Sequence, residues 1–156
     1  MVEDGGNIYF LYNRFTKVPE NAKVGPAAWG SAAVLSAIDE GLAGIEDLGC
    51  RYRSLGFSPK WPVTPYKELR YFSGYEVGGD VVDVRYILTD AGMRYCVDSP
   101  ARQMSAHILL PEGADATTVL LNGNPVEFWQ VLVGDSRYVD FSARGLKGRA
   151  NIEILF

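Results

Sequence analysis

The sequence predicts a mainly β protein, an antiparallel two-sheet β-sandwich of about nine strands preceded by one α-helix. Three observations lead to this prediction. From residue 50 onward, apolar and polar side chains alternate with a period of two, as in half-buried strands. Turn-forming groups of Gly, Asn, Asp, Ser and Pro separate the alternating runs at regular intervals. Upstream, residues 27–43 instead have the apolar spacing of a helix.

The chain of 156 residues has the length of one ordinary domain. We expect a single domain over residues 24–156, which contains the helix and the sandwich, and an N-terminal extended segment over residues 1–23. The apolar run at residues 8–12 fits either a strand or a buried helical turn, because short apolar runs do not separate the two.

The predicted helix begins after Gly25-Pro26, since proline suits the first helical position, and ends at Gly44 or Gly49. Its apolar stripe consists of Val34, Ile38, Leu42 and Ile45.

The remaining faces of the helix are small and uncharged as far as Asp39. A helix with one side in water normally has a polar face, so this one is expected to pack against something outside its own domain. The predicted interface residues are Trp29, Val34, Ile38 and Leu42.

Alternation and turn signals place the sandwich strands one after another. Asn122-Gly123 is the strongest hairpin signal, and the three prolines of residues 58–65 favour a linker there. The expected strands are 52–57, 69–75, 81–89, 93–98, 104–110, 117–121, 126–133, 137–143 and 151–156.

Composition excludes several classes of function. The net charge of −4 and the scattered basic residues argue against a nucleic-acid partner, and no apolar stretch is long enough to span a bilayer. The acidic N-terminus lacks the basic start of a secretion signal, so a cytoplasmic location is expected.

Cys50 and Cys96 are too few for a disulfide framework, and we expect two reduced thiols, with one bridge between them as the alternative. No cofactor or metal site is predicted.

The sequence contains no self-contained catalytic constellation, and no catalytic residue is predicted. The single histidine, His107, is expected to be structural or at the surface, because one imidazole cannot build a His-rich metal site. Whether the chain is an enzyme stays open, and a third hypothesis is a site assembled from Asp140, Arg137 and His107.

Aromatic side chains are the candidates for a ligand platform, because an exposed ring can stack on a sugar. Trp129 alternates with Phe128 on its expected strand, so one of the two must point away from the core. The predicted ligand-binding residues are Trp61, Trp129 and Tyr75.

The segment from Pro26 to Gly49, with Trp29-Gly30-Ser31 and Glu40-Gly41-Leu42 inside it, resembles the last helix of bacterial (α/α)6-barrel six-hairpin glycoside hydrolases and disaccharide phosphorylases. The Ser58-Pro-Lys-Trp-Pro62 segment and the strands after Asn122-Gly123 are similar to the following region of those enzymes. The resemblance covers residues 24–156 and implies the last barrel helix followed by a C-terminal β-sandwich. The catalytic residues of such enzymes lie upstream, so none is transferred to this chain.

The resemblance implies a non-catalytic accessory domain of a carbohydrate-active enzyme, which braces a helical catalytic domain or binds carbohydrate weakly. The alternative is a stand-alone interaction module that forms a homo-oligomer through its apolar helix.

Overall fold

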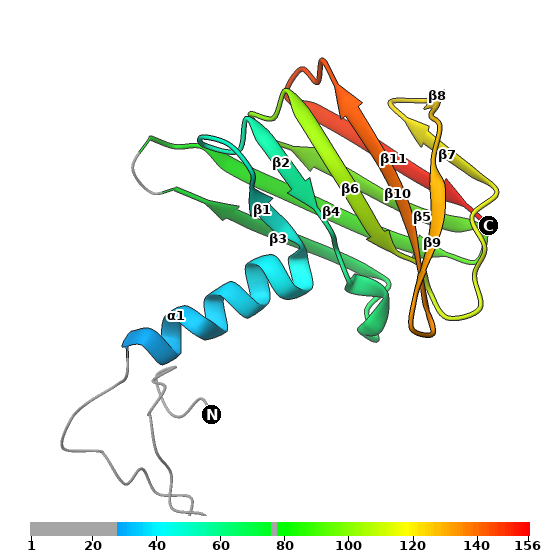
Figure 1. Ribbon diagram of the computed structural model, residues 1–156, viewed down its shortest axis with the longest axis horizontal. Helices are drawn as coiled ribbons and strands as arrows, with labels where there is room; N and C mark the ends of the chain where they lie inside the picture. The colour runs from blue at the N-terminus through cyan, green and yellow to red at the C-terminus, as the bar shows by residue number, and fades with distance from the viewer. Residues whose placement is uncertain (1–27, 76–77) are drawn as a thin grey trace, which may run out of the picture. The chain divides into compact units, whose positions relative to one another are not determined.

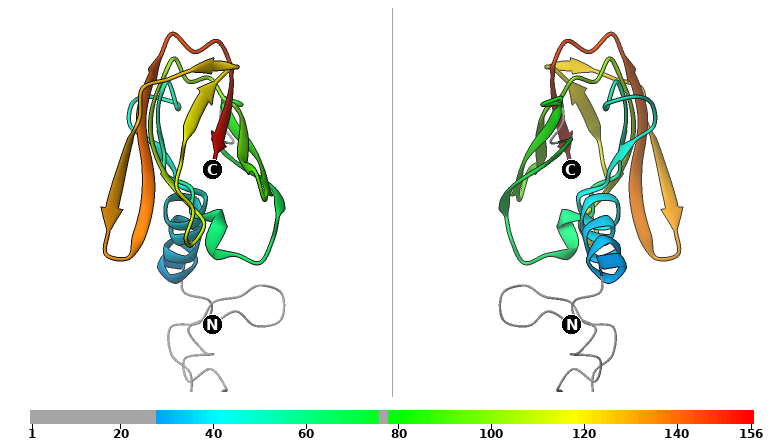
Figure 2. Two further views of the ribbon diagram at one scale, coloured as in Figure 1. Left: turned by 90° about the vertical axis from the view of Figure 1, so that its right-hand side faces the viewer. Right: turned by 90° about the vertical axis from the view of Figure 1, so that its left-hand side faces the viewer.

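The computed structural model describes residues 28–75 and 78–156, and the predicted extended segment 1–23 lies outside them. Within these ranges, eleven strands form two sheets of five and six strands. The sheets are packed as two layers, which Figure 2 shows edge-on. The predicted mainly β fold with one preceding helix is confirmed. The chain divides into two units, Met1–Ile38 and Asp39–Phe156, and the second contains the whole sandwich.

The five-stranded sheet has the order β1-β2-β6-β10-β9, and the six-stranded sheet has the order β3-β4-β5-β11-β7-β8 (Figure 1). The first sheet consists of β1 (Ile45–Asp47), β2 (Ser54–Phe57), β6 (Gln103–Leu109), β10 (Ser136–Arg144) and β9 (Trp129–Val133). The second consists of β3 (Glu68–Gly74), β4 (Val81–Thr89), β5 (Gly92–Asp98), β11 (Arg149–Leu155), β7 (Thr118–Leu121) and β8 (Asn124–Pro125).

The helix was predicted over the right residues and ends at Gly44, one of its two predicted ends, but its second half is not a regular α-helix. It runs as α1 (Ala28–Ser36) and widens into a π-helix, η3 (Ala37–Ala43). Gly44 ends it with a φ of +65°, a conformation that glycine adopts without strain. Ile45 therefore does not belong to the helical stripe, because it starts β1 and is buried in the core.

One pair of strands departs from the antiparallel prediction. β2 and β6 run parallel, with Gly56 opposite Ser105, whereas the other strand pairs are antiparallel. Residues 58–65 explain the direction, because they carry the chain from β2 in one sheet to β3 in the other. The predicted linker is thus a connection between the two sheets, and part of it is buried. Pro59 is buried, and the 3₁₀ turn η4 (Trp61–Val63) places Trp61 in the core.

The sandwich core is formed by the inward side chains of both sheets. Phe57 from the five-stranded sheet meets Tyr95 from the six-stranded sheet edge to face, with ring centroids 5.4 Å apart. Tyr86 lies beside Tyr95 at 5.1 Å. The hydroxyl groups of Tyr86 and Tyr95 are buried and have no hydrogen-bond partner among the described residues, and burial raises the pKa of Tyr95 well above its ordinary value.

Replacing Tyr95 with phenylalanine is expected to leave the free energy of unfolding unchanged or to raise it by up to about 1 kcal/mol. The reason is that a buried hydroxyl without a partner costs desolvation and returns no hydrogen bond. Urea unfolding of both proteins measures the difference. A loss of stability greater than about 1 kcal/mol would show that the hydroxyl has a partner in solution.

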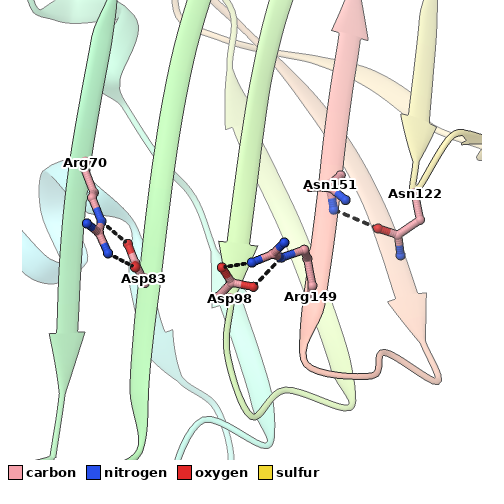
Figure 3. Close-up of polar contacts among 6 residues, drawn as sticks. All are labelled: Arg70, Asp83, Asp98, Asn122, Arg149 and Asn151. Carbon is pink, nitrogen blue, oxygen red and sulfur yellow. Dashed lines mark hydrogen bonds and ion pairs between the residues drawn. The ribbon is translucent and has the colours of Figure 1, made fainter.

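The outer face of the six-stranded sheet is a ladder of ion pairs that satisfy one another (Figure 3). Arg70 holds Asp83 through two hydrogen bonds of 3.0 and 2.6 Å, and Arg149 holds Asp98 through two of 2.6 and 2.7 Å. These arginines lower the pKa of both carboxyl groups below their ordinary value. The ladder fixes the positions of the charged side chains on this face. Most of these side chains already have a partner of opposite charge.

The two aspartates make the free energy of unfolding depend on pH in the acidic range. Because the folded-state pKa of Asp98 lies below its unfolded value, its contribution is present above the unfolded pKa of 3.8 and is lost as the pH falls through the folded value. Arg149→Gln is therefore expected to shrink the loss of stability on acidification from about pH 6 to about pH 3. The groups are exposed, so the effect is modest and weakens with salt. Equal pH profiles for both proteins at low salt would contradict the assignment.

The two cysteines, Cys50 and Cys96, are unpaired, which confirms the prediction of free thiols. No helix among the described residues combines the length and the apolarity needed to cross a membrane.

Candidate functional site

The outer face of the five-stranded sheet carries a carboxylate, an imidazole and an indole side by side, and these groups can contact a ligand. On β10 the inward residues include Val139 and Phe141, so Asp140 between them points outward. The strand register places Asp140 opposite His107 of β6 on one side and opposite Trp129 of β9 on the other. Residues directly opposite in a sheet have Cβ atoms about 5 Å apart. Trp129, Asp140 and His107 therefore form a row across three neighbouring strands.

His107 is held in a fixed orientation by two neighbours. Its Nδ1 atom lies 2.5 Å from Oδ1 of Asp140. Its ring stacks on Tyr138, with centroids 4.1 Å apart and an angle of 8° between the planes. Since the carboxylate takes Nδ1, Nε2 is the ring nitrogen left for a ligand.

Trp129 lies on β9, the edge strand of its sheet, and 59% of it is exposed. The hairpin of β9 and β10 closes over two residues, with Gly134 at a φ of +59°. Beneath β9, the amide of Gln130 accepts a hydrogen bond from the backbone of Ala116 and donates one to it, at 3.1 and 3.3 Å. The edge strand that carries the indole is thus anchored at both ends.

A shallow hollow of about 180 Å³ continues the row on the far side of His107. Its lining includes Glu40 of η3, Glu46 of β1, Gly56 of β2, Ser58 just after β2, and Ser105 of β6. A side chain at Gly56 would meet the Cβ of Glu46 at 3.1 Å, so glycine keeps this space open.

Together these groups offer a flat aromatic surface, a hydrogen-bonding imidazole with its carboxylate, and a small polar hollow. A ligand with an apolar face and several hydroxyl groups matches that combination. Its apolar face can stack on the indole, and its hydroxyl groups can meet the hydrogen-bond donors and acceptors beside it. Across residues 28–75 and 78–156, no three His, Cys, Asp or Glu side chains lie close enough together to hold a metal ion.

The three predicted ligand-binding aromatics do not come together. Trp61 is only 5% exposed and packs against Tyr71, with ring centroids 5.8 Å apart, so the expectation that it offers a free ring is wrong. Its apolar surface completes the core where the chain crosses between the sheets. Trp129 is the only one of the three that presents an exposed face on the site described above.

Tyr75 lies at the other side of the sandwich from Trp129. Its hydroxyl donates a 2.9 Å hydrogen bond to Asp47, and its ring tilts against Tyr52 at 5.1 Å. Asp47 also accepts from the backbone of Tyr52, at 3.0 Å. Burial raises the pKa of Asp47, but these hydrogen bonds outweigh it, and the net shift is downward. Tyr75 thus helps to fix the loop between β1 and β2.

The dispersed set His107, Asp140 and Arg137 is brought together only in part. His107 and Asp140 are in contact, whereas Arg137 forms an ion pair with Asp115 instead. Tyr138 was not among the predicted residues, although its position two residues before Asp140 on the same strand places it on the same face.

The predicted interface residues of the helix do not form one exposed surface. Val34 and Ile38 are exposed, and so is Leu35, at 63%. Leu42 instead packs against the core of the sandwich, because η3 leads directly into β1. The side chain of Trp29 lies outside the described part of the structure.

Comparison with known proteins adds one structural likeness. No protein-family model matches the sequence, and no curated protein matches it with significance. Among solved structures, the chain is similar to an alpha-L-rhamnosidase from Dictyoglumus thermophilum, with 16% identity and a TM-score of 0.48. The match covers 74% of this chain and 12% of that enzyme, so the chain spans only a small part of its length. At this identity and TM-score, the likeness does not decide the function.

Proposed function

We propose that the chain is a non-catalytic accessory domain of a carbohydrate-active enzyme, which binds carbohydrate weakly on the outer face of the five-stranded sheet. The observation that carries this proposal is the exposed Trp129 beside the Asp140–His107 pair. The indole has 59% of its surface in water. A sugar ring that covers it removes apolar surface from water, which favours binding. The neighbouring imidazole and carboxylate supply a donor and an acceptor for sugar hydroxyls.

The opposite face of the sandwich supports the choice of side. There, Asp83 and Asp98 are each held by two hydrogen bonds from an arginine, so a ligand would have to displace existing ion pairs. On the five-stranded sheet, no side chain within residues 28–75 and 78–156 forms a hydrogen bond, ion pair or ring contact with the indole of Trp129. A sugar ring that covers Trp129 therefore displaces no existing ion pair.

Trp129→Ala is expected to weaken glycan binding by at least about tenfold, because a central aromatic anchor contributes most of the energy of a small interface. Binding is measured by titration calorimetry against glycans selected on a glycan array. Phe72→Ala is the matched control, since Phe72 is 71% exposed on the outer face of the six-stranded sheet. Equal affinity of wild type and Trp129→Ala, or an equal loss in Phe72→Ala, would contradict the proposal.

A second candidate function rests on the helix. Val34, Leu35 and Ile38 are exposed apolar side chains in a stretch, residues 28–38, that contains no charged residue. Such a surface favours burial against another helix, either in the helical catalytic domain of a parent enzyme or in a second copy of this chain.

Leu35→Glu tests the homodimer version of this second function. Wild-type protein is expected to associate as its concentration rises, and the variant to stay monomeric, because a charge in the contact would have to be desolvated. Light scattering over a concentration series measures the mass of both. A wild-type protein that remains a monomer at high concentration would exclude the homodimer.

A further inference from the structure

The row of groups on the five-stranded sheet is longer than one sugar ring. From Trp129 on β9 to the hollow at β2, three strand spacings separate the two ends, or roughly 14 Å. Asp140 and His107 lie between them on β10 and β6. A monosaccharide placed on Trp129 reaches its immediate neighbour Asp140 but does not reach the hollow.

The charges along this row are acidic. Asp140 lies at its centre, and Glu46 and Glu40 line the hollow at its end. The ion pairs of the described residues give neither Glu40 nor Glu46 a basic partner. On the same face of β10, Arg144 lies four residues from Asp140, or about 13 Å along the strand.

Lys60 adds one positive charge next to the hollow, because its ammonium group contacts the carbonyl oxygen of Ser58. Lys60 is not among the residues that line the hollow, and its ammonium group donates to the carbonyl oxygens of Gly41 and Ser58, at 3.0 and 3.5 Å. An anionic ligand on the row would therefore face the three carboxylates of Asp140, Glu46 and Glu40 against the single lysine beside the hollow, and like charges in contact disfavour binding.

We propose that this face binds an uncharged oligosaccharide of at least two rings, which lies across the strands from Trp129 to the hollow beside Glu46, and that it rejects acidic glycans. This inference rests on the proposed function and adds to it the length and charge of the ligand. Trp129 stacks on the first ring, the His107–Asp140 pair binds hydroxyls at the middle, and the space above Gly56 receives the far end.

The length of the ligand is tested with Ser105→Tyr, which fills the hollow from its β6 side. For wild type, affinity is expected to rise at least about tenfold from one ring to three, which corresponds to about 1.4 kcal/mol. In Ser105→Tyr this gain disappears, whereas binding of the single ring is unchanged. Glu68→Tyr on β3 places the same ring on the other sheet and is the control.

The charge preference is tested on a glycan array of neutral and uronic-acid oligosaccharides of defined length, with wild type and a Glu40→Gln, Glu46→Gln double variant. We expect wild type to bind neutral oligosaccharides, and the double variant to gain several-fold in affinity for acidic ones. Equal binding of monosaccharides and longer glycans, or preferred binding of acidic glycans, overturns this inference and leaves the proposed function standing. Absence of binding to every glycan, by wild type and Phe72→Ala alike, overturns both.

Discussion

Gly44→Ala is expected to destabilise the protein by about 3 kcal/mol. Two costs add up: a residue with a side chain must adopt a left-handed backbone conformation, and the new Cβ atom forces neighbouring packed backbone to move. Gly44 has a φ of +65° at the point where the helix turns into β1. A Cβ atom there would lie 2.0 Å from the carbonyl carbon of Ser58, so one of the two backbone segments must move. The displaced segment leads into Trp61 and the core.

Gly41→Ala is the matched control for this prediction. Gly41 lies three residues earlier in η3, and a Cβ atom there would meet nothing within 4 Å. Alanine is expected to stabilise this position by about 0.5–1 kcal/mol, because it favours the helix and restricts the unfolded chain. Urea unfolding of the three proteins measures both effects, and equal stabilities would contradict the close approach of Gly44 to Ser58.

Phe57→Ala is expected to cost about 3–5 kcal/mol, the range for removal of a large side chain from a packed core. Phe57 is fully buried, and its ring meets Tyr95 of the other sheet at an angle of 87°. Its loss opens a cavity between the layers that neither sheet can close, because each is fixed by its strand ladder.

Phe72→Ala removes the same ring from an exposed position on β3. Its effect on the free energy of unfolding is expected to stay within about 0.5 kcal/mol. Thermal and urea unfolding of both variants give the comparison. A loss below about 1.5 kcal/mol in Phe57→Ala would show that the two layers are not packed as described.

The strands were predictable where local pattern alone determines them. Alternation defined β4 over the observed residues, and Asn122-Gly123 forms the expected tight hairpin, with both residues at positive φ. β1 was missed because three residues are too few to show a period of two. The parallel pairing of β2 with β6 was missed because strand direction depends on the path of the chain between the sheets.

The candidate site was predictable only in part for the same reason. Alternation indicated that either Phe128 or Trp129 faces outward, and the structure shows that Trp129 does. The contact of His107 with Asp140 joins residues 33 positions apart and depends on the register of β6 with β10. Trp61 was misjudged because a proline-rich neighbourhood indicates a loop but does not show whether the loop is buried.

The central claim is that glycans bind at Trp129 on the outer face of the five-stranded sheet. Titration of the ¹⁵N-labelled protein with a glycan selected on the array, followed by NMR, tests it most directly. We expect the indole N–H signal of Trp129 and the backbone signals of Asp140, His107 and Ser105 to shift together, while those of Asp83 and Asp98 stay in place. Shifts confined to the six-stranded sheet, or no shift at Trp129 at a saturating glycan concentration, would contradict the claim.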